Sequence, residues 1–179
     1  MSGLTPSQTV GPFFHIGLHW PEGWRAAVDH GDGPRITLRG RVFDGDGAAV
    51  PDALIEIWQA DSEGRYHAHR EQGFCGAGRC AVDAQGGFCF ETCIPGRVVL
   101  PDGRLQAPHI NLLVLARGLL QHLYTRVYFA ADTAAHNDDA VLACVPPARR
   151  ATLIALPVGD EHVFDIHLQG EYETVFFEL

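Results

Sequence analysis

His109 and Asn111 lie two residues apart at the start of an apolar run that continues through Leu112–Leu115. Such a run predicts a β-strand, in which side chains two residues apart point to the same face. Two histidines at this spacing can supply two ligands to one transition metal, because neutral imidazole is a common metal ligand. Here the second position is an amide, whose neutral oxygen is a weak ligand for a trivalent cation. The strand keeps the geometry of a metal site but only one of its two histidine ligands, which indicates a degenerate copy of an enzyme.

Tyr66 is a second candidate ligand, in the turn-like sequence Gly64-Arg65-Tyr66-His67. Tyrosinate is a hard anion suited to Fe(III), and together with His109 it makes a mixed oxygen and nitrogen ligand set. The alternative is structural: a buried, hydrogen-bonded tyrosine and a histidine of the core. His67 and His69, beside two arginines, are interpreted as a solvated cluster rather than a metal site.

Arg126 lies in the strand-like run Tyr124–Phe129 and is either a surface residue or an anion clamp. The chain has no lysine, since all 13 of its Lys and Arg residues are arginine. Schiff-base chemistry and a P-loop lysine are therefore excluded, and any anion site must use the planar fork of a guanidinium. In the N-terminal run Thr9–Phe13, the pair Gly11-Pro12 either lets backbone approach a ligand closely or simply forms a turn.

The composition is that of a protein with one domain and a real core: 179 residues, 46% apolar and 20% charged. A net charge of −9 argues against a nucleic-acid partner. No run approaches the roughly 20 apolar residues of a membrane span, and no secretory leader is recognisable, so a cytoplasmic location is expected. The five cysteines form no Cys-x-x-Cys pair and are predicted to be reduced packing residues rather than a zinc site.

Alternating apolar residues and turn signals predict strands at 35–42, 53–58, 88–93, 109–116, 121–129 and 163–169. Residues 67–80 are expected to form a loop, 137–144 a short helix capped by Asn137, and 149–154 a further strand. Residues 1–34 are irregular but apolar, and must pack on their own domain or on a partner. The fold class predicted is a single all-β domain, residues 1–179: a Greek-key β-sandwich of short antiparallel strands with an irregular N-terminal arm and few short helices.

Six segments together resemble the intradiol ring-cleaving dioxygenase family, in order and over nearly the whole chain. They are TPSQTVGPFFHIG at 5–17, LRGRVFDGDG at 38–47, IEIWQADSEGRY at 55–66, APHIN at 107–111, HLYTRVYF at 122–129 and FDIHLQGEYETVFF at 164–177. Catalytic beta chains of the heteromeric members hold Fe(III) with two tyrosines and two histidines, with an arginine just before the histidine strand.

The resemblance matches Tyr66 to the first tyrosine and His109 to the first histidine, but the remaining positions depart from the pattern. The second tyrosine falls near Val98, the second histidine is Asn111, and the arginine is Gln106. The resemblance therefore implies an alpha subunit with no catalytic residue and no metal of its own. Its Fe(III) is bound by a partner beta subunit, and the vestigial metal positions are Tyr66, Val98, His109 and Asn111.

The resemblance also implies that the alpha subunit lines part of the partner's active site. The substrate-binding residues carried over are Thr9, Gly11, Pro12 and Arg126, with Phe13 as an aromatic wall. The implied substrate is a small catechol bearing a carboxylate, 3,4-dihydroxybenzoate, which is cleaved with O2. A guanidinium in a partly desolvated cleft attracts such an anion and helps to orient it.

Two other functions are compatible with parts of the sequence. One is a homomeric intradiol dioxygenase with its own iron, which Val98 and Asn111 disfavour. The other is a non-enzymatic Greek-key module of the transthyretin or carboxypeptidase-regulatory type, which the long aromatic N-terminal arm and the last strand disfavour.

Overall fold

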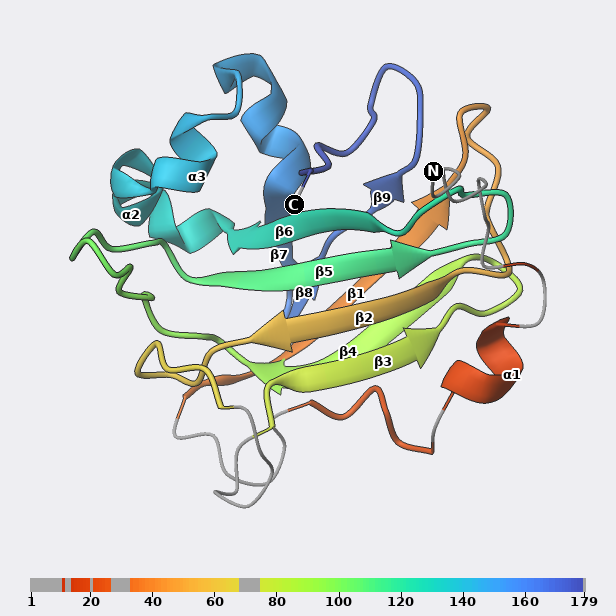
Figure 1. The fold of residues 1–179 in the computed structure, drawn as a ribbon, viewed down its shortest axis with the longest axis horizontal. Helices are drawn as coiled ribbons and strands as arrows, with labels where there is room; N and C mark the ends of the chain where they lie inside the picture. The colour runs from red at the N-terminus through yellow and green to blue at the C-terminus, as the bar shows by residue number, and fades with distance from the viewer. Residues whose placement is uncertain (1–10, 12–13, 20, 27–32, 68–74, 179) are drawn as a thin grey trace, which may run out of the picture.

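The computed structural model describes residues 11, 14–19, 21–26, 33–67 and 75–178. Strands dominate this part of the chain, with few short helices between them (Figure 1). The strands are β1 (Arg35–Phe43), β2 (Leu54–Gln59), β3 (Ala77–Ala81), β4 (Gly87–Cys93), β5 (His109–Leu115), β6 (Leu123–Phe129), β7 (Ile154–Val158), β8 (Glu161–Val163) and β9 (Ile166–His167). The helical elements are α1 (Phe14–Leu18), η2 (Ala130–Asp132), α2 (Thr133–Asp138), α3 (Ala140–Ala143) and η3 (Pro147–Leu153).

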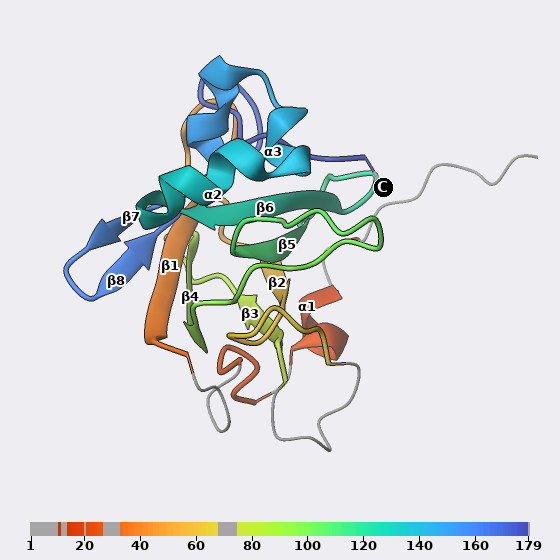
Figure 2. The same cartoon turned by 90° about the vertical axis from the view of Figure 1, so that its left-hand side faces the viewer.

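The described strands form one mixed sheet in the order β3-β2-β5-β6-β7-β8-β1-β4, with β9 paired to β1. The sheet curls so that its β1–β4 half faces its β2–β5–β6 half (Figures 1 and 2). The prediction of an all-β fold with few short helices is confirmed. The Greek-key sandwich of antiparallel strands is not confirmed, because β6 pairs with β7, and β1 with β8 and β9, in parallel. The helical crossover between β6 and β7 makes their parallel pairing possible.

The core lies between the two halves of the curled sheet and consists of alternate residues of each strand. On β1, Leu38 and Val42 are fully buried, and between them Gly40 allows β1 to approach the carbonyl group of Phe164 closely. From the opposite half, the buried residues include Ile55, Ile110, Leu112, Val114 and Val127. The other face of β5 and β6 is therefore turned away from this core.

Part of the N-terminal arm packs on its own domain. Gly23 accepts a backbone hydrogen bond from Arg79 on β3, at 2.6 Å. On the other side, the Trp24 carbonyl accepts from the Glu91 amide of β4 at 3.1 Å, and the Ala26 amide donates to the Glu91 carbonyl at 2.9 Å. Residues 23–26 thus join the two outer strands of the sheet.

Three local predictions are wrong. Strand β3 begins at Ala77, within the segment 67–80 that was expected to be a loop. Asn137 lies within α2, and the side chain that caps α3 is that of Asp139, which accepts hydrogen bonds from Val141 N and Leu142 N. Residues 147–153 form a 3-10 helix, because Pro147 favours a helix start, and the strand begins only at Ile154. No helix in the described ranges is long and apolar enough to cross a membrane.

Candidate functional site

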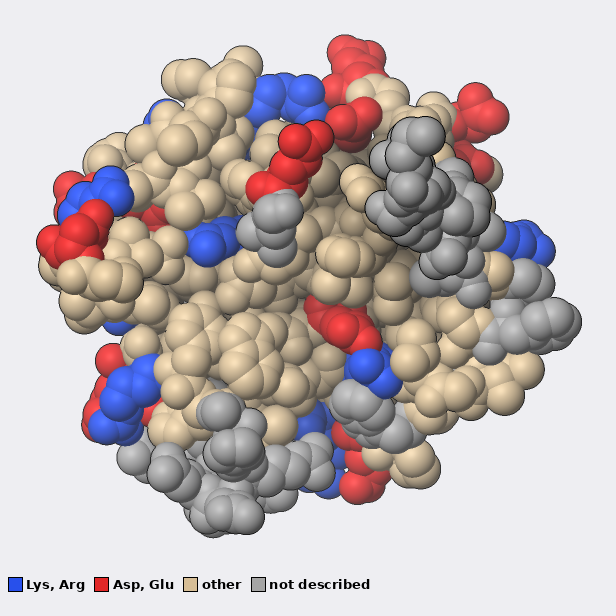
Figure 3. Space-filling model, viewed as in Figure 1, with Lys and Arg blue, Asp and Glu red and all other residues tan. Residues whose placement is uncertain are grey.

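The predicted site residues meet on the outward face of β5 and β6. Asn111 is paired directly with Arg126 across the two strands, and on its other side with Trp58 of β2. Directly opposite residues of an antiparallel pair share one face, so these three side chains form a row across the sheet. Trp58 also stacks on Tyr66, with 5.9 Å between ring centroids. Uncharged side chains cover much of the surface over β2 and β5, with acidic and basic atoms side by side near its centre (Figure 3).

Tyr66 is positioned by the tight turn that precedes it. The carboxylate of Asp61 accepts hydrogen bonds at 2.9 Å from the backbone amides of Glu63 and Arg65, and one at 2.7 Å links its other oxygen to His67. Burial alone raises the pKa of Asp61, but the bonds from His67 and Arg65 outweigh it and lower the pKa to about 2. His67 is thus held by Asp61, and the prediction of a solvated cluster is wrong for this residue, while His69 lies outside the described residues.

His109 is buried, 1% exposed, and is bonded at both ring nitrogens. Nδ1 lies 2.8 Å from the Ala107 carbonyl oxygen. Because a carbonyl only accepts, Nδ1 carries the proton, and the free lone pair of Nε2 accepts from the Tyr66 hydroxyl at 3.3 Å. Burial, assisted by the positive charge of Arg126, lowers the pKa of His109 to about 4. The imidazole is therefore neutral near pH 7.

Asn111 is held at both ends of its amide. Its NH2 group donates to the Tyr66 hydroxyl at 2.8 Å, and its oxygen accepts from the Tyr124 hydroxyl. Burial raises the pKa of Tyr66 and so keeps its phenol protonated. Tyr124, Asn111, Tyr66 and His109 thus form a continuous hydrogen-bonded chain, here called the polar chain.

The polar chain does not fit a ferric ion. Val98, at the position of the second tyrosine, has no side-chain donor atom, and its backbone oxygen accepts from Gln106 N at 2.8 Å. The Asn111 oxygen is already occupied by a hydroxyl, and the two ligand types that remain, Tyr66 and His109, bond each other. Within the described ranges, no group of three or more His, Cys, Asp or Glu side chains is arranged to hold a metal.

Arg126 brings a half-buried cation to the polar chain. Its guanidinium interacts electrostatically with Tyr124 and Tyr128, the next residues on the same face of β6. Its Nη1 atom is buried and has no hydrogen-bond partner among the described residues. A buried N–H of a cation without a partner is costly, and a bound anion would satisfy it.

The structure thus brings together Arg126 and three of the four vestigial positions, Tyr66, His109 and Asn111. Gly11 has a backbone φ of +72°, and a Cβ added there would meet nothing within 4 Å. Thr9, Pro12 and Phe13 lie outside the described residues, so their predicted roles stay predictions.

Three residues at the site were not predicted: Tyr124, Tyr128 and Asp139. The two tyrosines could have been found, because a period of two from Arg126 places both on its face. Asp139 is fully buried and accepts a hydrogen bond from the Tyr128 hydroxyl at 3.3 Å. Nothing in its local sequence distinguishes it from the neighbouring Asp138.

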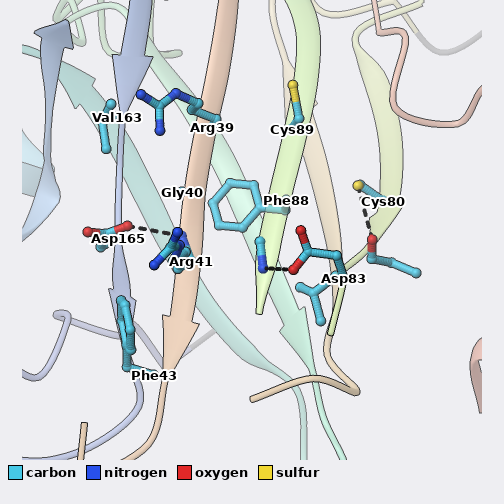
Figure 4. Close-up of a pocket in the computed structure, with 13 residues that line it drawn as sticks. Arg39, Gly40, Arg41, Phe43, Cys80, Asp83, Phe88, Cys89, Val163 and Asp165 are labelled. Atoms are coloured by element: carbon cyan, nitrogen blue, oxygen red, sulfur yellow. Dashed lines mark hydrogen bonds between the residues drawn. The ribbon is translucent and has the colours of Figure 1, made fainter. Parts of the chain in front are cut away.

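Away from the polar chain, a hollow on the outer side of β1 and β4 holds two of the cysteines (Figure 4). Cys80 and Cys89 extend from β3 and β4, and burial raises the pKa of both thiols. Two carboxylates of the hollow accept backbone hydrogen bonds, Asp165 from Arg41 and Asp83 from Gly87. All five cysteines lie in the described part of the chain and are free. Cys93 is buried, but Cys89 and Cys144 are exposed and are therefore not packing residues.

Comparisons with known proteins find dioxygenases. A family model described as Dioxygenase matches residues 11–172. The protocatechuate 3,4-dioxygenase alpha chain of Burkholderia cepacia is 43% identical, over 98% of this chain and 97% of that protein. The beta chain of the same enzyme is 34% identical, over 83% of this chain and 71% of that one. Among solved structures, the dioxygenase domain of a carbohydrate-binding fusion protein from Streptomyces sp. SirexAA-E matches with a TM-score of 0.64 at 27% identity, over 93% of this chain and 98% of that one.

Proposed function

Because this chain belongs to the intradiol ring-cleaving dioxygenase family, we propose that it acts as the alpha subunit of a protocatechuate 3,4-dioxygenase. A beta subunit that binds Fe(III) supplies the metal centre, and this chain completes the wall of the partner's active site. The enzyme cleaves 3,4-dihydroxybenzoate with O2 to 3-carboxy-cis,cis-muconate: the bond between the hydroxylated carbons breaks and both oxygen atoms enter the product. This reaction belongs to the β-ketoadipate pathway of aromatic catabolism, in the cytoplasm.

The observation that carries the proposal is the state of the polar chain. Every donor atom that the family's metal site could use here is either missing, at Val98, or engaged, at Asn111, Tyr66 and His109. A homomeric dioxygenase with its own iron needs four side-chain ligands, but Val98 has no donor atom and Asn111 offers only a weak neutral amide. The higher identity to an alpha chain than to a beta chain supports the same assignment.

The contribution of this chain to the substrate is electrostatic and steric. Arg126 supplies a positive charge for the substrate carboxylate, and its partial burial strengthens the attraction. Thr9, Gly11 and Pro12 are proposed to line the same pocket. The lack of a Cβ at Gly11 supports a close approach of backbone to a bound ring.

The assembly test compares this chain alone with its complex with a beta chain. Bound iron and the tyrosinate-to-iron absorption are measured in both samples, together with ring cleavage. We expect iron-free, colourless, inactive protein alone and a coloured, active complex. Stoichiometric iron in the isolated chain refutes the alpha-subunit assignment and favours the homomeric dioxygenase.

The substrate-binding test is Arg126→Ala in the complex. Loss of a charge-assisted contact should lower kcat/KM for 3,4-dihydroxybenzoate by about 10-fold or more, with iron content unchanged. Arg104→Ala is the matched control, since Arg104 is 61% exposed and pairs with Asp102. Equal kinetics in the two variants would refute the role of Arg126.

A further inference from the structure

We propose that Tyr128 and Tyr124 are positioning residues that hold the Arg126 guanidinium from its two sides. Asp139 orients the hydroxyl of Tyr128, and Asn111 orients that of Tyr124. The inference rests on the proposed role of Arg126 and adds the residues that aim it. It accounts for a buried Tyr–Asp pair and for the amide at position 111, neither of which the proposed function by itself requires.

The strand places the three side chains in one line. Tyr124, Arg126 and Tyr128 are alternate residues of β6, so their side chains leave the sheet on the same face. The burial pattern agrees, because Thr125 and Val127 between them are fully buried on the core side. A long arginine side chain between two tyrosines on one face can contact both hydroxyl oxygens.

The Tyr128 hydroxyl has its proton directed away from Arg126. It donates to Asp139 Oδ1 at 3.3 Å, and both residues are 0% exposed. The carboxylate itself is fixed: Oδ1 accepts from Val141 N and Leu142 N at 2.9 and 2.8 Å, and Oδ2 accepts from Ala107 N at 2.8 Å. A carboxylate only accepts, so the single proton of Tyr128 is used there and its lone pairs are left for the guanidinium.

The Tyr124 hydroxyl is arranged in the same way on the other side. It donates to the Asn111 oxygen, and the orientation of that amide is fixed because its NH2 group donates to Tyr66. The lone pairs of Tyr124 are therefore also available to Arg126. Asn111 thus has a function in this arrangement, as the acceptor that orients Tyr124.

Two neutral phenols orient the guanidinium without neutralising it. A carboxylate in direct contact would form an ion pair and reduce the attraction for an incoming anion. Here the carboxylate of this arrangement belongs to Asp139, the N-cap residue of α3, and it acts through the Tyr128 hydroxyl. Helix α3 lies beside β6 (Figure 2). The Nη1 atom stays without a partner among the described residues, so the hydrogen-bonding capacity of the guanidinium is not exhausted within this chain.

The test is a double-mutant cycle in the assembled complex, with Tyr128→Phe, Arg126→Ala and both together. The substrates are 3,4-dihydroxybenzoate and 4-methylcatechol, which lacks the carboxylate. We expect Tyr128→Phe to lower kcat/KM for 3,4-dihydroxybenzoate by about 5- to 20-fold, mainly through KM, and to change that for 4-methylcatechol less than about 2-fold. In the Arg126→Ala background the same substitution should have no further effect. Tyr172→Phe, at an exposed residue, is the control for loss of a hydroxyl.

An equal loss for both substrates, a loss that persists in the Arg126→Ala background, or no loss at all overturns the positioning role. If Arg126→Ala itself leaves kcat/KM unchanged, the proposed role of Arg126 fails, and the positioning role with it. Assembly and iron content are checked for each variant. If Tyr128→Phe does not assemble, Tyr124→Phe takes its place, with the same carboxylate-specific loss expected and the same outcomes refuting it.

Discussion

Acidification should destabilise this chain through His109, because the buried imidazole is neutral in the fold and titrates freely once unfolded. Burial and the nearby charge of Arg126 lower the pKa of His109 from 6.5 to about 4. The unfolded chain therefore binds more protons than the folded chain between these two values. The stabilisation is fully present above about pH 6.5 and is lost as the pH falls toward about 4.

The size of the effect follows from the two pKa values. Linkage predicts that this one histidine lowers the unfolding free energy by about 1.3 kcal/mol between pH 7.5 and pH 5.5, and by about 2.5 kcal/mol by pH 4.5. Against the 5–15 kcal/mol of a typical domain, roughly 2.5 kcal/mol is large enough to measure.

The assay is urea unfolding of the chain at pH 7.5, 5.5 and 4.5, for the native sequence and for His109→Asn. Asparagine can still donate to the Ala107 carbonyl but does not titrate in this range. The variant should be less stable at pH 7.5, and its stability should fall less on acidification, by about 2.5 kcal/mol at pH 4.5. His122→Asn, at an exposed histidine, is the matched control. A His109→Asn variant whose pH dependence equals that of the native chain would refute the reasoning, since it would mean that the buried ring does not titrate as its surroundings require.

Three further predictions concern the same region. Asp61→Asn should lower the unfolding free energy by about 1–2 kcal/mol at pH 7. The stability of the variant should also depend less on pH between about 4 and 2, because the carboxyl group with a pKa of about 2 in the folded chain is gone. Urea unfolding at each pH measures both effects, and a stability equal to that of the native chain contradicts the prediction. Gly64→Ala should cost more than about 2 kcal/mol, since φ is +83° and the added Cβ overlaps the carbonyl oxygen of Arg97; an unchanged melting temperature would exclude this. Asn111→His should not create an iron site, because Val98 still lacks a donor atom; elemental analysis tests this, and one iron per chain would disprove it.

The sequence predicted those parts of the site that depend on a single strand. The placement of His109 and Asn111 on one face needed only the period of two. The β-branched and aromatic content of 121–129 predicted a strand, which the structure has at Leu123–Phe129. Strand β3 was missed because its glycine reads as a loop signal. In the fold, Gly78 is needed because a Cβ added there would lie within 3.1 Å of Ala26, the Gly23 carbonyl and Ile57, and these are tertiary contacts. The sheet order also escaped prediction, since parallel pairing across a helical crossover leaves no local pattern.

The cap of α3 shows the same limit. Asn137, Asp138 and Asp139 are all good capping residues, and their order along the chain does not say which one caps. Of these three residues, only Asp139 accepts hydrogen bonds from the Ala107 amide and the Tyr128 hydroxyl, and these tertiary contacts decide which residue caps the helix. The degenerate metal position could therefore be recognised from the sequence, while the arrangement around Arg126 could not.

Residues 23–26 close the gap between the two outer strands of the sheet, and this closure affects how the chain folds and how soluble it is during folding. These residues bond Arg79 on one outer strand and Glu91 on the other, both far along the chain, so the closure has a high loop entropy cost and should form late. Until then, both outer strands present free backbone amides and carbonyls to other molecules. A chain shortened past residue 26 should keep these edges open permanently and associate through them, so refolding yield would depend steeply on protein concentration.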